Sequence, residues 1–167
     1  MKTLTLLRHA KSSWDHPELA DIDRPLNKRG KRDAPIMGER LARAGISPEL
    51  ILTSPARRAR KTASRVARAL GYPADRIVVD PRIYAAAPAE LMALIRGLDD
   101  RWSDVMLVGH NPTLTELANE LTAADIDNVP TAGVVRIRFP VPSWSDIRPG
   151  AGELTLFDYP KRAVTPR

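Results

Sequence analysis

The feature that most constrains the fold is an unbroken apolar run, Val105–Val108, which reads Val-Met-Leu-Val. A strand that faces water on one side alternates apolar and polar residues, whereas a continuous apolar run is typical of a strand covered on both faces. Helices cover both faces of a sheet when they connect parallel strands. The run therefore predicts an internal strand of an α/β sheet that has helices on each side.

Five other short runs have strand character, and helical patterns separate most of them. The expected strands are 3–7, 50–52, 77–79, 134–139 and 153–157. In the intervening segments, apolar residues recur at three- and four-residue spacing, as on one face of a helix. This alternation predicts a single-domain three-layer α/β sandwich whose mostly parallel central sheet has about six strands. The domain is expected to span residues 1–160, followed by a loose tail at 161–167.

Two helix starts can be predicted from the local sequence. Asn27 is a good capping residue for the first helix, although Pro35 lies within the helical pattern and makes a later start the alternative. Ser54 and Pro55 follow the second expected strand and predict that the next helix begins there. The free N–H groups of a helix start favour a bound anion.

Residues that can do chemistry follow three of the expected strands at their carboxyl ends. Arg8 and His9 come after the first strand, and Ser54 with an arginine-rich turn comes after the second. His110 comes directly after the central apolar run and one glycine. In an open α/β sheet, the ligand site lies beyond the carboxyl ends of the strands. Two of the three histidines are therefore expected to face one crevice together with arginines.

These residue types fit phosphoryl transfer. Arginine forks match the oxygens of a phosphoryl group and neutralise their charge. A neutral imidazole can attack phosphorus and carry the group covalently, and a second imidazole can hydrogen-bond the oxygens in the transition state. The set predicts phosphoryl transfer through a phosphohistidine.

Other chemistries find less support in the sequence. The chain has no cysteine, which excludes disulfides, Cys-based zinc sites and cysteine-dependent phosphatases. Asp15, Asp21 and Asp23 lie near His9 and His16 in the sequence, but their spacing matches no metal-ligand pattern. There is no phosphate-binding loop with a lysine and no nucleophile elbow around a serine. The prediction therefore includes neither a metal nor a cofactor.

Composition bears on partners and location. The net charge of +6 and the pI of about 10.1 are compatible with nucleic-acid binding. However, the basic residues are spread over several helices, and aromatic residues, on which bases stack, are only 5% of the chain. We therefore expect no nucleic-acid binding, and attraction to anionic substrates or acidic partner proteins instead. No apolar run is long enough to predict a membrane span, and Met1 leads directly into a strand. A cytoplasmic protein is expected, with a monomer as its simplest assembly.

Three ordered sequence blocks resemble those of a known family. Arg8-His9-Ala10 is similar to the Arg-His-Gly signature of the histidine phosphatase superfamily, the phosphoglycerate-mutase-like proteins. Residues 54–62, which read Ser-Pro-Ala-Arg-Arg-Ala-Arg-Lys-Thr, resemble the second block of that family, Ser-Pro-x-x-Arg-Ala-x-x-Thr. Residues 108–111, Val-Gly-His-Asn, resemble the third, and the order and spacing agree over residues 3–122.

One branch of the family is closer to this sequence than the others. Ala10 in place of glycine, followed by Lys11-Ser12, resembles the SixA-like phosphohistidine phosphatases. The short chain and residues 23–30, which read Asp-Arg-Pro-Leu-Asn-Lys-Arg-Gly, resemble that branch as well.

The resemblance implies a role for four residues of the site. His9 would be the nucleophile that becomes phosphorylated. Arg8 and Arg58 would hold the phosphoryl oxygens, and His110 would complete the pocket. Trp14, in the loop after His9, would form either a wall of the pocket or part of a local core.

The roles of the residues next to these four require separate arguments. Arg58 is preferred to Arg57 because it lies four residues after Ser54, as the arginine of the family's second block does. Ser12 is expected to touch the phosphate through its hydroxyl or its backbone N–H. Asp15 lies where many relatives place a phosphate-contacting asparagine, but a carboxylate would repel a phosphate dianion, so no role is transferred to it.

One departure from the family pattern narrows the range of expected substrates. Relatives that hydrolyse alkyl phosphates have a glutamate about three residues before an aromatic residue, whereas Tyr84 here is preceded by Pro81 at that position, and Asp80 is only a weak substitute. An alkoxide leaving group needs such an acid, often worth about 10²–10⁴-fold, but an imidazole can arrive already protonated. The leading prediction is therefore hydrolysis of phosphohistidine on a partner protein. The alternatives are the same mechanism on a small phosphate monoester and a non-enzymatic module that binds phosphorylated ligands.

Overall fold

A six-stranded mixed sheet lies at the centre of the molecule. The computed structural model of the chain describes residues 1–162. The strands are β1 (Lys2–Arg8), β2 (Leu50–Thr53), β3 (Val78–Val79), β4 (Asp104–Gly109), β5 (Val134–Phe139) and β6 (Glu153–Asp158). They lie in the order β3-β2-β4-β1-β5-β6, and only β5 runs against the others, so the prediction of a mostly parallel sheet is confirmed. The last five residues of the tail expected at 161–167 lie outside the described residues.

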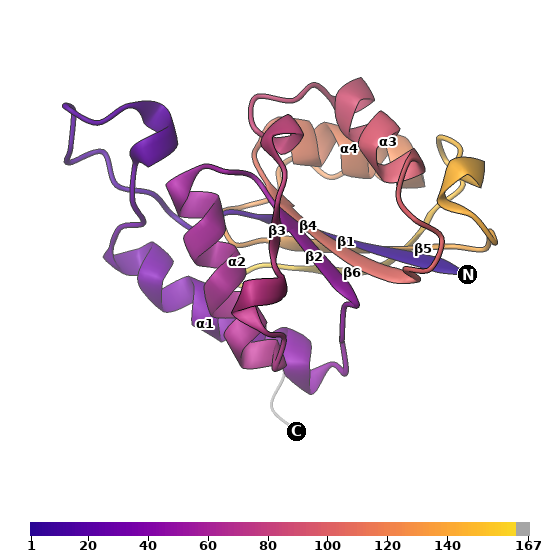
Figure 1. Cartoon of the computed structure of the whole chain (residues 1–167), viewed down its shortest axis with the longest axis horizontal. Coiled ribbons are helices and arrows are strands. Elements are labelled where there is room, and N and C mark those ends of the chain that lie inside the picture. The colour runs from indigo at the N-terminus through magenta and orange to yellow at the C-terminus, as the bar shows by residue number, and fades with distance from the viewer. Residues whose placement is uncertain (163–167) are drawn as a thin grey trace.

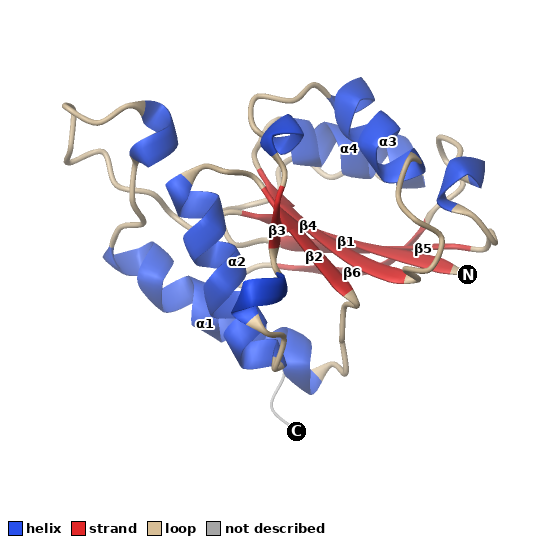
Figure 2. Cartoon of the chain, viewed as in Figure 1, coloured by secondary structure: helices blue, strands red, loops and turns tan. Residues whose placement is uncertain are grey.

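Four helices cover the two faces of this sheet. They are α1 (Lys28–Arg43), α2 (Arg57–Leu70), α3 (Pro88–Arg96) and α4 (Thr113–Thr122). The helices α1 and α2 pack on one face and α3 and α4 on the other (Figure 1). Figure 2 shows the strands as the middle of three layers, which is the α/β sandwich expected from the sequence.

The apolar run of β4 serves both layers of helices. Met106 and Val108 pack into the core beneath α1 and α2, whereas Val105 and Leu107 pack into the core beneath α3 and α4. All four side chains are fully buried. An alternating polar residue at any of these positions would lose its water without gaining a partner, which is why the run is continuous.

The first helix begins where its capping residue predicts. The side chain of Asn27 accepts a hydrogen bond from the N–H of Gly30, so α1 starts at Lys28 and the alternative start near Pro35 is wrong. Pro35 lies inside α1, where its missing N–H removes one bond to the carbonyl of Lys31, a residue exposed to water. The cap and the buried apolar face outweigh that loss.

The second helix begins later than predicted. Ser54 and Pro55 lie in a turn, and α2 starts only at Arg57. The hydroxyl of Ser54 accepts a hydrogen bond of 3.1 Å from the N–H of Ala56, which closes the turn before the helix. The helix start expected at Ser54 is therefore wrong, because this buried serine belongs to the turn beside the sheet.

The strand order brings three carboxyl ends together. β4 lies between β1 and β2, and all three are parallel. The ladder continues one residue further, because His9 N–H donates to the carbonyl of Gly109 (3.1 Å) and Ser54 N–H donates to that of Val108 (3.0 Å). His9, Ser54 and His110 therefore leave the sheet along one edge.

Candidate active site

His9 is held in one orientation by its own backbone. The ring is almost fully buried, with 8% of the residue exposed, and its Nδ1 lies 2.8 Å from the carbonyl oxygen of Ala10. A carbonyl oxygen can only accept, so Nδ1 carries the proton and Nε2 keeps a free lone pair. The ring centroids of His9 and His110 are 5.2 Å apart. This arrangement leaves Nε2 of His9 unprotonated, with the ring of the second histidine close by.

Burial keeps both histidines neutral. Removal from water lowers the pKa of His9 to about 3, and the charges of His110, Arg58 and Arg8 act in the same direction. Burial followed by the charge of Arg58 lowers the pKa of His110 to about 4. A protonated imidazole has no lone pair with which to attack phosphorus, so the low pKa of His9 suits a nucleophile.

The depressed pKa of His9 predicts an acid-sensitive fold. Between pH 6.5 and about 3 the unfolded chain binds a proton at His9 that the folded protein does not, so stability falls as the pH falls through this window. We expect the free energy of unfolding to drop by about 2 kcal/mol from pH 7 to pH 5 through His9 alone. Urea unfolding at both pH values measures it. His9→Gln is expected to remove this part of the dependence, and an identical drop in that variant would contradict the assignment.

Of the two neighbouring arginines, Arg58 is the one that reaches the histidines. It is 6% exposed, and its Nη2 lies 3.5 Å from Nδ1 of His110. Arg57 is exposed on the outer side of α2. The one-residue difference turns the side chain by about 100° around the helix, which separates a pocket residue from a surface residue.

Arg8 and Arg58 carry unused hydrogen-bond donors. Nη1 of Arg8 donates to the carbonyl of Val129 at 2.9 Å. The Nε groups of Arg8 and Arg58 are both buried and have no partner among residues 1–162. Burial also lowers the pKa of Arg8, and no carboxylate within the described part of the chain pairs with it. Buried donors without partners are rare, and a bound oxyanion would satisfy them.

His110 is supported from below by Ser54. Its Nε2 lies 2.8 Å from the fully buried Oγ of Ser54, while the guanidinium of Arg58 approaches its Nδ1. Because Arg58 can only donate, Nδ1 accepts and Nε2–H donates to the serine. The serine hydroxyl can also donate to Nε2, which would leave Nδ1–H free for a phosphoryl oxygen. Ser54 thus supports either tautomer, a role that its place in the second sequence block did not reveal.

Asp21, which the sequence brings up only as part of a rejected metal-ligand set, is a residue of the site. It lies in the short helix η1 (Asp21–Asp23), in the loop at the upper left of Figure 1. Its Oδ2 accepts from Nη2 of Arg58 (3.0 Å) and from the hydroxyl of Tyr84 (2.7 Å), and its Oδ1 accepts from Nε of Arg24 (3.1 Å). Partial burial acts in the opposite direction, but these hydrogen bonds lower the pKa of Asp21 well below its usual value. The carboxylate is therefore ionised and neutralises part of the cationic pocket.

Ser12 is near the site but already engaged. Its hydroxyl accepts a hydrogen bond of 2.7 Å from Nη1 of Arg24, which also donates to the carbonyl of Ser13. The Arg24 guanidinium stacks 3.6 Å from the ring centroid of Trp14, and Trp14 itself is 72% exposed. Trp14 is therefore not part of a local core. Arg24 thus holds the loop together through hydrogen bonds and a stacking contact that the sequence pattern did not predict.

Neither carboxylate that could serve as a proton donor is poised to do so. Asp80 is held by Arg82, with Oδ2 2.7 Å from Nη2 and Oδ1 3.0 Å from Nε, and this hydrogen bonding lowers the pKa of Asp80. Asp21 is ionised as described, and Tyr84 donates to it, which raises the pKa of the phenol. The pocket thus offers neutral imidazoles, arginines and ionised carboxylates.

Among residues 1–162, no three histidine, aspartate and glutamate side chains gather as metal ligands would, and Asp21 pairs with Arg58 instead. No helix in the same range has the length and apolar character needed to cross a membrane.

Comparison with known proteins places the chain among phosphatases. A model of the histidine phosphatase superfamily (branch 1) matches residues 4–84. The chain is 32% identical over 165 residues to an uncharacterised protein of Mycobacterium tuberculosis, covering 93% of this chain and 100% of that protein. The structure of a putative phosphohistidine phosphatase SixA from Agrobacterium tumefaciens is 30% identical, with a TM-score of 0.82 over 95% of this chain and 98% of that one.

A more distant structure shares the fold alone. A mycobacterial glucosyl-3-phosphoglycerate phosphatase in complex with VO3 is 18% identical, with a TM-score of 0.70 over 95% of this chain and 100% of that one. Together with the blocks around His9, Arg58 and His110, the family model and the SixA structure from Agrobacterium tumefaciens support a phosphatase of the hydrolase class. The chain belongs to the histidine phosphatase superfamily and is a SixA-like member of it.

Proposed function

We propose that the protein hydrolyses phosphohistidine on a partner protein through a phosphohistidine formed on His9. The observation that carries the proposal is the buried, neutral ring of His9, whose Nε2 is free while Nδ1 is bound to Ala10. The unsatisfied donors of Arg8 and Arg58 add an anion-binding character to the same pocket. A module that only binds phosphorylated ligands has no need of a neutral nucleophile.

The reaction proceeds in two displacements at phosphorus. In the first, Nε2 of His9 attacks, the P–N bond to the partner breaks, and the partner's imidazole leaves with the bonding electrons. That imidazole is neutral on leaving because its other nitrogen already carries a proton. In the second, a water oxygen attacks phosphorus, the bond to Nε2 breaks, and inorganic phosphate is released with the two hydrogens of water.

The cationic groups favour the transition states of both steps. Arg8 and Arg58 bring fixed positive charge to the equatorial oxygens, where negative charge concentrates. In the tautomer that carries its proton on Nδ1, His110, 5.2 Å from His9 between ring centroids, can add a hydrogen bond to these oxygens. These groups are preorganised by burial, so little reorganisation is needed when the charge develops.

The leaving group follows from the missing proton donor. Pro81 stands where relatives have glutamate, Asp80 is ion-paired with Arg82, and Asp21 is ionised. An alkoxide leaving group needs a proton donor, and the pocket does not offer one. A phosphoimidazole that is already protonated leaves without such a donor. A small phosphate ester is the second candidate, because the fold is shared with a glucosyl-3-phosphoglycerate phosphatase.

A substrate comparison tests this proposal. We expect kcat/KM for a phosphohistidine peptide to exceed that for any ester in a panel of sugar and glycerate phosphates by at least about 10²-fold, the scale of a missing general acid. Asp80→Asn is expected to change neither value, since that carboxyl is not the acid. A clear preference for one ester would overturn the proposal in favour of the second candidate. Tight binding without hydrolysis of any phosphate would favour the binding module.

A further inference from the structure

One face of α2 is strongly cationic. The helix contains six basic residues and no acidic one. Arg58 turns into the pocket, and the other five are exposed. We call these five the α2 basic stripe: Arg57, Arg60, Lys61, Arg65 and Arg68. From Arg57 to Arg68 the stripe is about 16 Å long, at 1.5 Å per residue.

The charge of the stripe is not compensated within the described chain. Other arginines pair with acids, as Arg136 does with Asp104 at 2.8 Å and Arg40 with Asp158 at 3.3 Å. In residues 1–162, no member of the stripe forms an ion pair. Five uncompensated like charges on one helix repel each other, so the arrangement costs stability that a negatively charged partner would restore.

The stripe begins at the active site. Arg57 is the immediate neighbour of Arg58, and a shallow depression of about 200 Å³ lies beside it. The depression is lined by Pro25, Leu26, Lys31, Arg57, Lys61 and Arg65. Its Pro25 directly follows Arg24, whose Nη1 donates to Ser12. Two residues that line the depression thus directly neighbour Arg58 and Arg24 in the sequence, and both of those arginines pair with Asp21.

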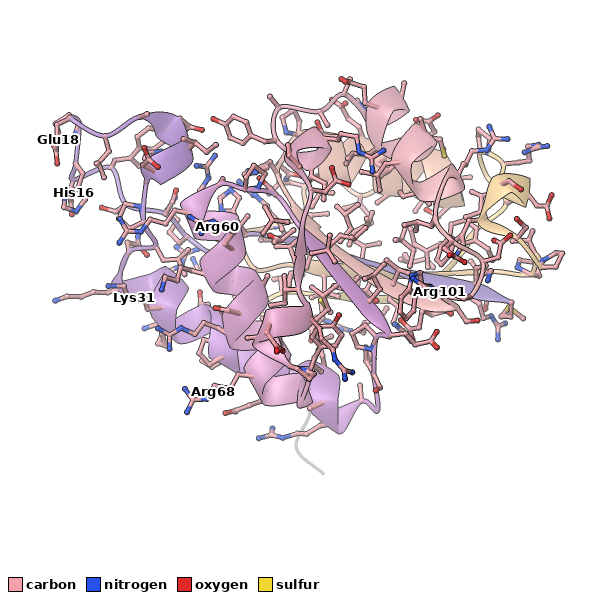
Figure 3. All side chains as sticks on the ribbon, viewed as in Figure 1. His16, Glu18, Lys31, Arg60, Arg68 and Arg101 are labelled. Carbon is pink, nitrogen blue, oxygen red and sulfur yellow. The ribbon has the colours of Figure 1, made fainter. Side chains whose placement is uncertain are left out.

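The lining of the depression combines cationic side chains with two apolar ones. Proline and leucine side chains can cover the methylene groups of a glutamate while the surrounding lysines and arginines bind its carboxylate. Farther along, a second depression of about 330 Å³ is lined by Lys61, Ser64, Arg65, Arg68, Tyr72 and Ala74. Figure 3 shows Arg60 and Arg68 on α2 and Lys31 on α1 along the same side of the molecule, whereas Arg101 lies at the far end of the sheet.

We infer that the α2 basic stripe docks an acidic surface of the partner protein whose phosphohistidine enters the pocket. The inference rests on the proposed function, since the partner it describes is the protein substrate. A nucleic acid fits less well, because bases need aromatic faces on which to stack. The hydroxyl of Tyr72 is bonded to the carbonyl of Arg76 and the ring is half-buried, and one face of Trp14 is covered by Arg24.

The test compares two synthetic phosphohistidine peptides, one with four glutamates beside the phosphohistidine and one with four glutamines. At about 50 mM salt, we expect the wild-type protein to hydrolyse the acidic peptide with a kcat/KM at least about 10-fold higher. Lys61→Glu/Arg65→Glu/Arg68→Glu is expected to abolish this preference, and about 1 M salt to do the same, because charges are then screened beyond about 3 Å. Turnover of phosphoramidate, which cannot reach the stripe, is expected to stay within about twofold.

Matched variants control for folding and net charge. Lys61→Gln/Arg65→Gln/Arg68→Gln removes the stripe charges without adding acids to the helix, and we expect it to lose most of the preference. Arg96→Glu/Arg101→Glu/Arg148→Glu changes the net charge by the same amount as Lys61→Glu/Arg65→Glu/Arg68→Glu, but at exposed positions far from α2. We expect this variant to keep the preference for the acidic peptide. An equal loss in this control would mean that overall charge, not the stripe, attracts the peptide, and would overturn the inference.

Binding of the unphosphorylated peptides separates this inference from the proposed function. If the protein hydrolyses both phosphohistidine peptides equally and binds the acidic one no better, the stripe has no docking role while the function stands. If no phosphohistidine is hydrolysed but the acidic peptide binds through the stripe, the function fails and the docking surface stands. Tighter stripe-dependent binding of a single-stranded RNA than of the acidic peptide would overturn the inference in favour of nucleic acid.

Discussion

His9→Ala is expected to lower kcat for every phosphate substrate by at least about 10⁴-fold, since loss of a covalent nucleophile leaves only the binding groups. It is also expected to abolish the phosphorylated form of the protein. In the wild type, brief exposure to a radiolabelled phosphohistidine peptide should leave label on the protein that is lost in acid and retained in base. The buried ring with its free Nε2 is the reason to place that label on His9.

The chain contains its own control for this experiment. His16 is an exposed histidine that lies 3.5 Å from Glu18, and His16→Ala is expected to keep both label and turnover. Turnover by His9→Ala within about 10-fold of the wild type, or label that persists in that variant, would show that the nucleophile lies elsewhere.

The second large effect is expected at Arg58. Arg58→Ala removes a buried guanidinium that lies beside His110, and we expect kcat/KM for phosphoramidate to fall by about 10²–10³-fold, the scale of one preorganised donor. The same change leaves the Asp21 carboxylate without its closest cation at the mouth of the pocket, which adds repulsion of the phosphoryl dianion. Adding Asp21→Asn to Arg58→Ala is therefore expected to recover part of the lost activity.

The neighbouring arginine provides the matched comparison. Arg57→Ala deletes the same group one residue earlier, where it is exposed, and turnover of phosphoramidate is expected to change by less than about twofold. A loss below about threefold in Arg58→Ala, or equal losses in the two variants, would contradict the placement of Arg58 in the phosphate pocket.

The sequence predicted those parts of the site that lie on regular elements. His9 and His110 each follow an apolar strand, and neighbouring parallel strands must end at the same edge of a sheet. Arg58 could be preferred to Arg57 because it lies four residues after Ser54, as the arginine of the family's second block does, and α2 turns it inward. In each case a local sequence pattern places the residue at the end of a strand or on a helix, and the topology of the sheet then brings these residues together.

The sequence could not predict the contacts made by the loop between β1 and α1. Asp21 pairs with Arg58, 37 residues away, and Tyr84 lies 63 residues from the carboxylate to which it donates. No periodicity links residues in an irregular loop to distant side chains, so only the folded chain reveals them. The start of α2 was misplaced for a related reason, because the hydroxyl of Ser54 caps a turn instead of a helix.

The carboxylate of Asp21 has a consequence for which ligands the pocket retains. An oxyanion that approaches Arg58 meets a site whose positive charge is already partly cancelled, so its binding is an exchange of one anion for another. Free inorganic phosphate has only the pocket to hold it and therefore gains little from that exchange. Under the proposed function, a phosphorylated partner protein would have contacts outside the pocket that offset the exchange, and once its phosphoryl group has been transferred, those contacts would no longer retain the phosphate. On that proposal, the Asp21 carboxylate would favour release of inorganic phosphate and would weaken inhibition of the protein by free phosphate.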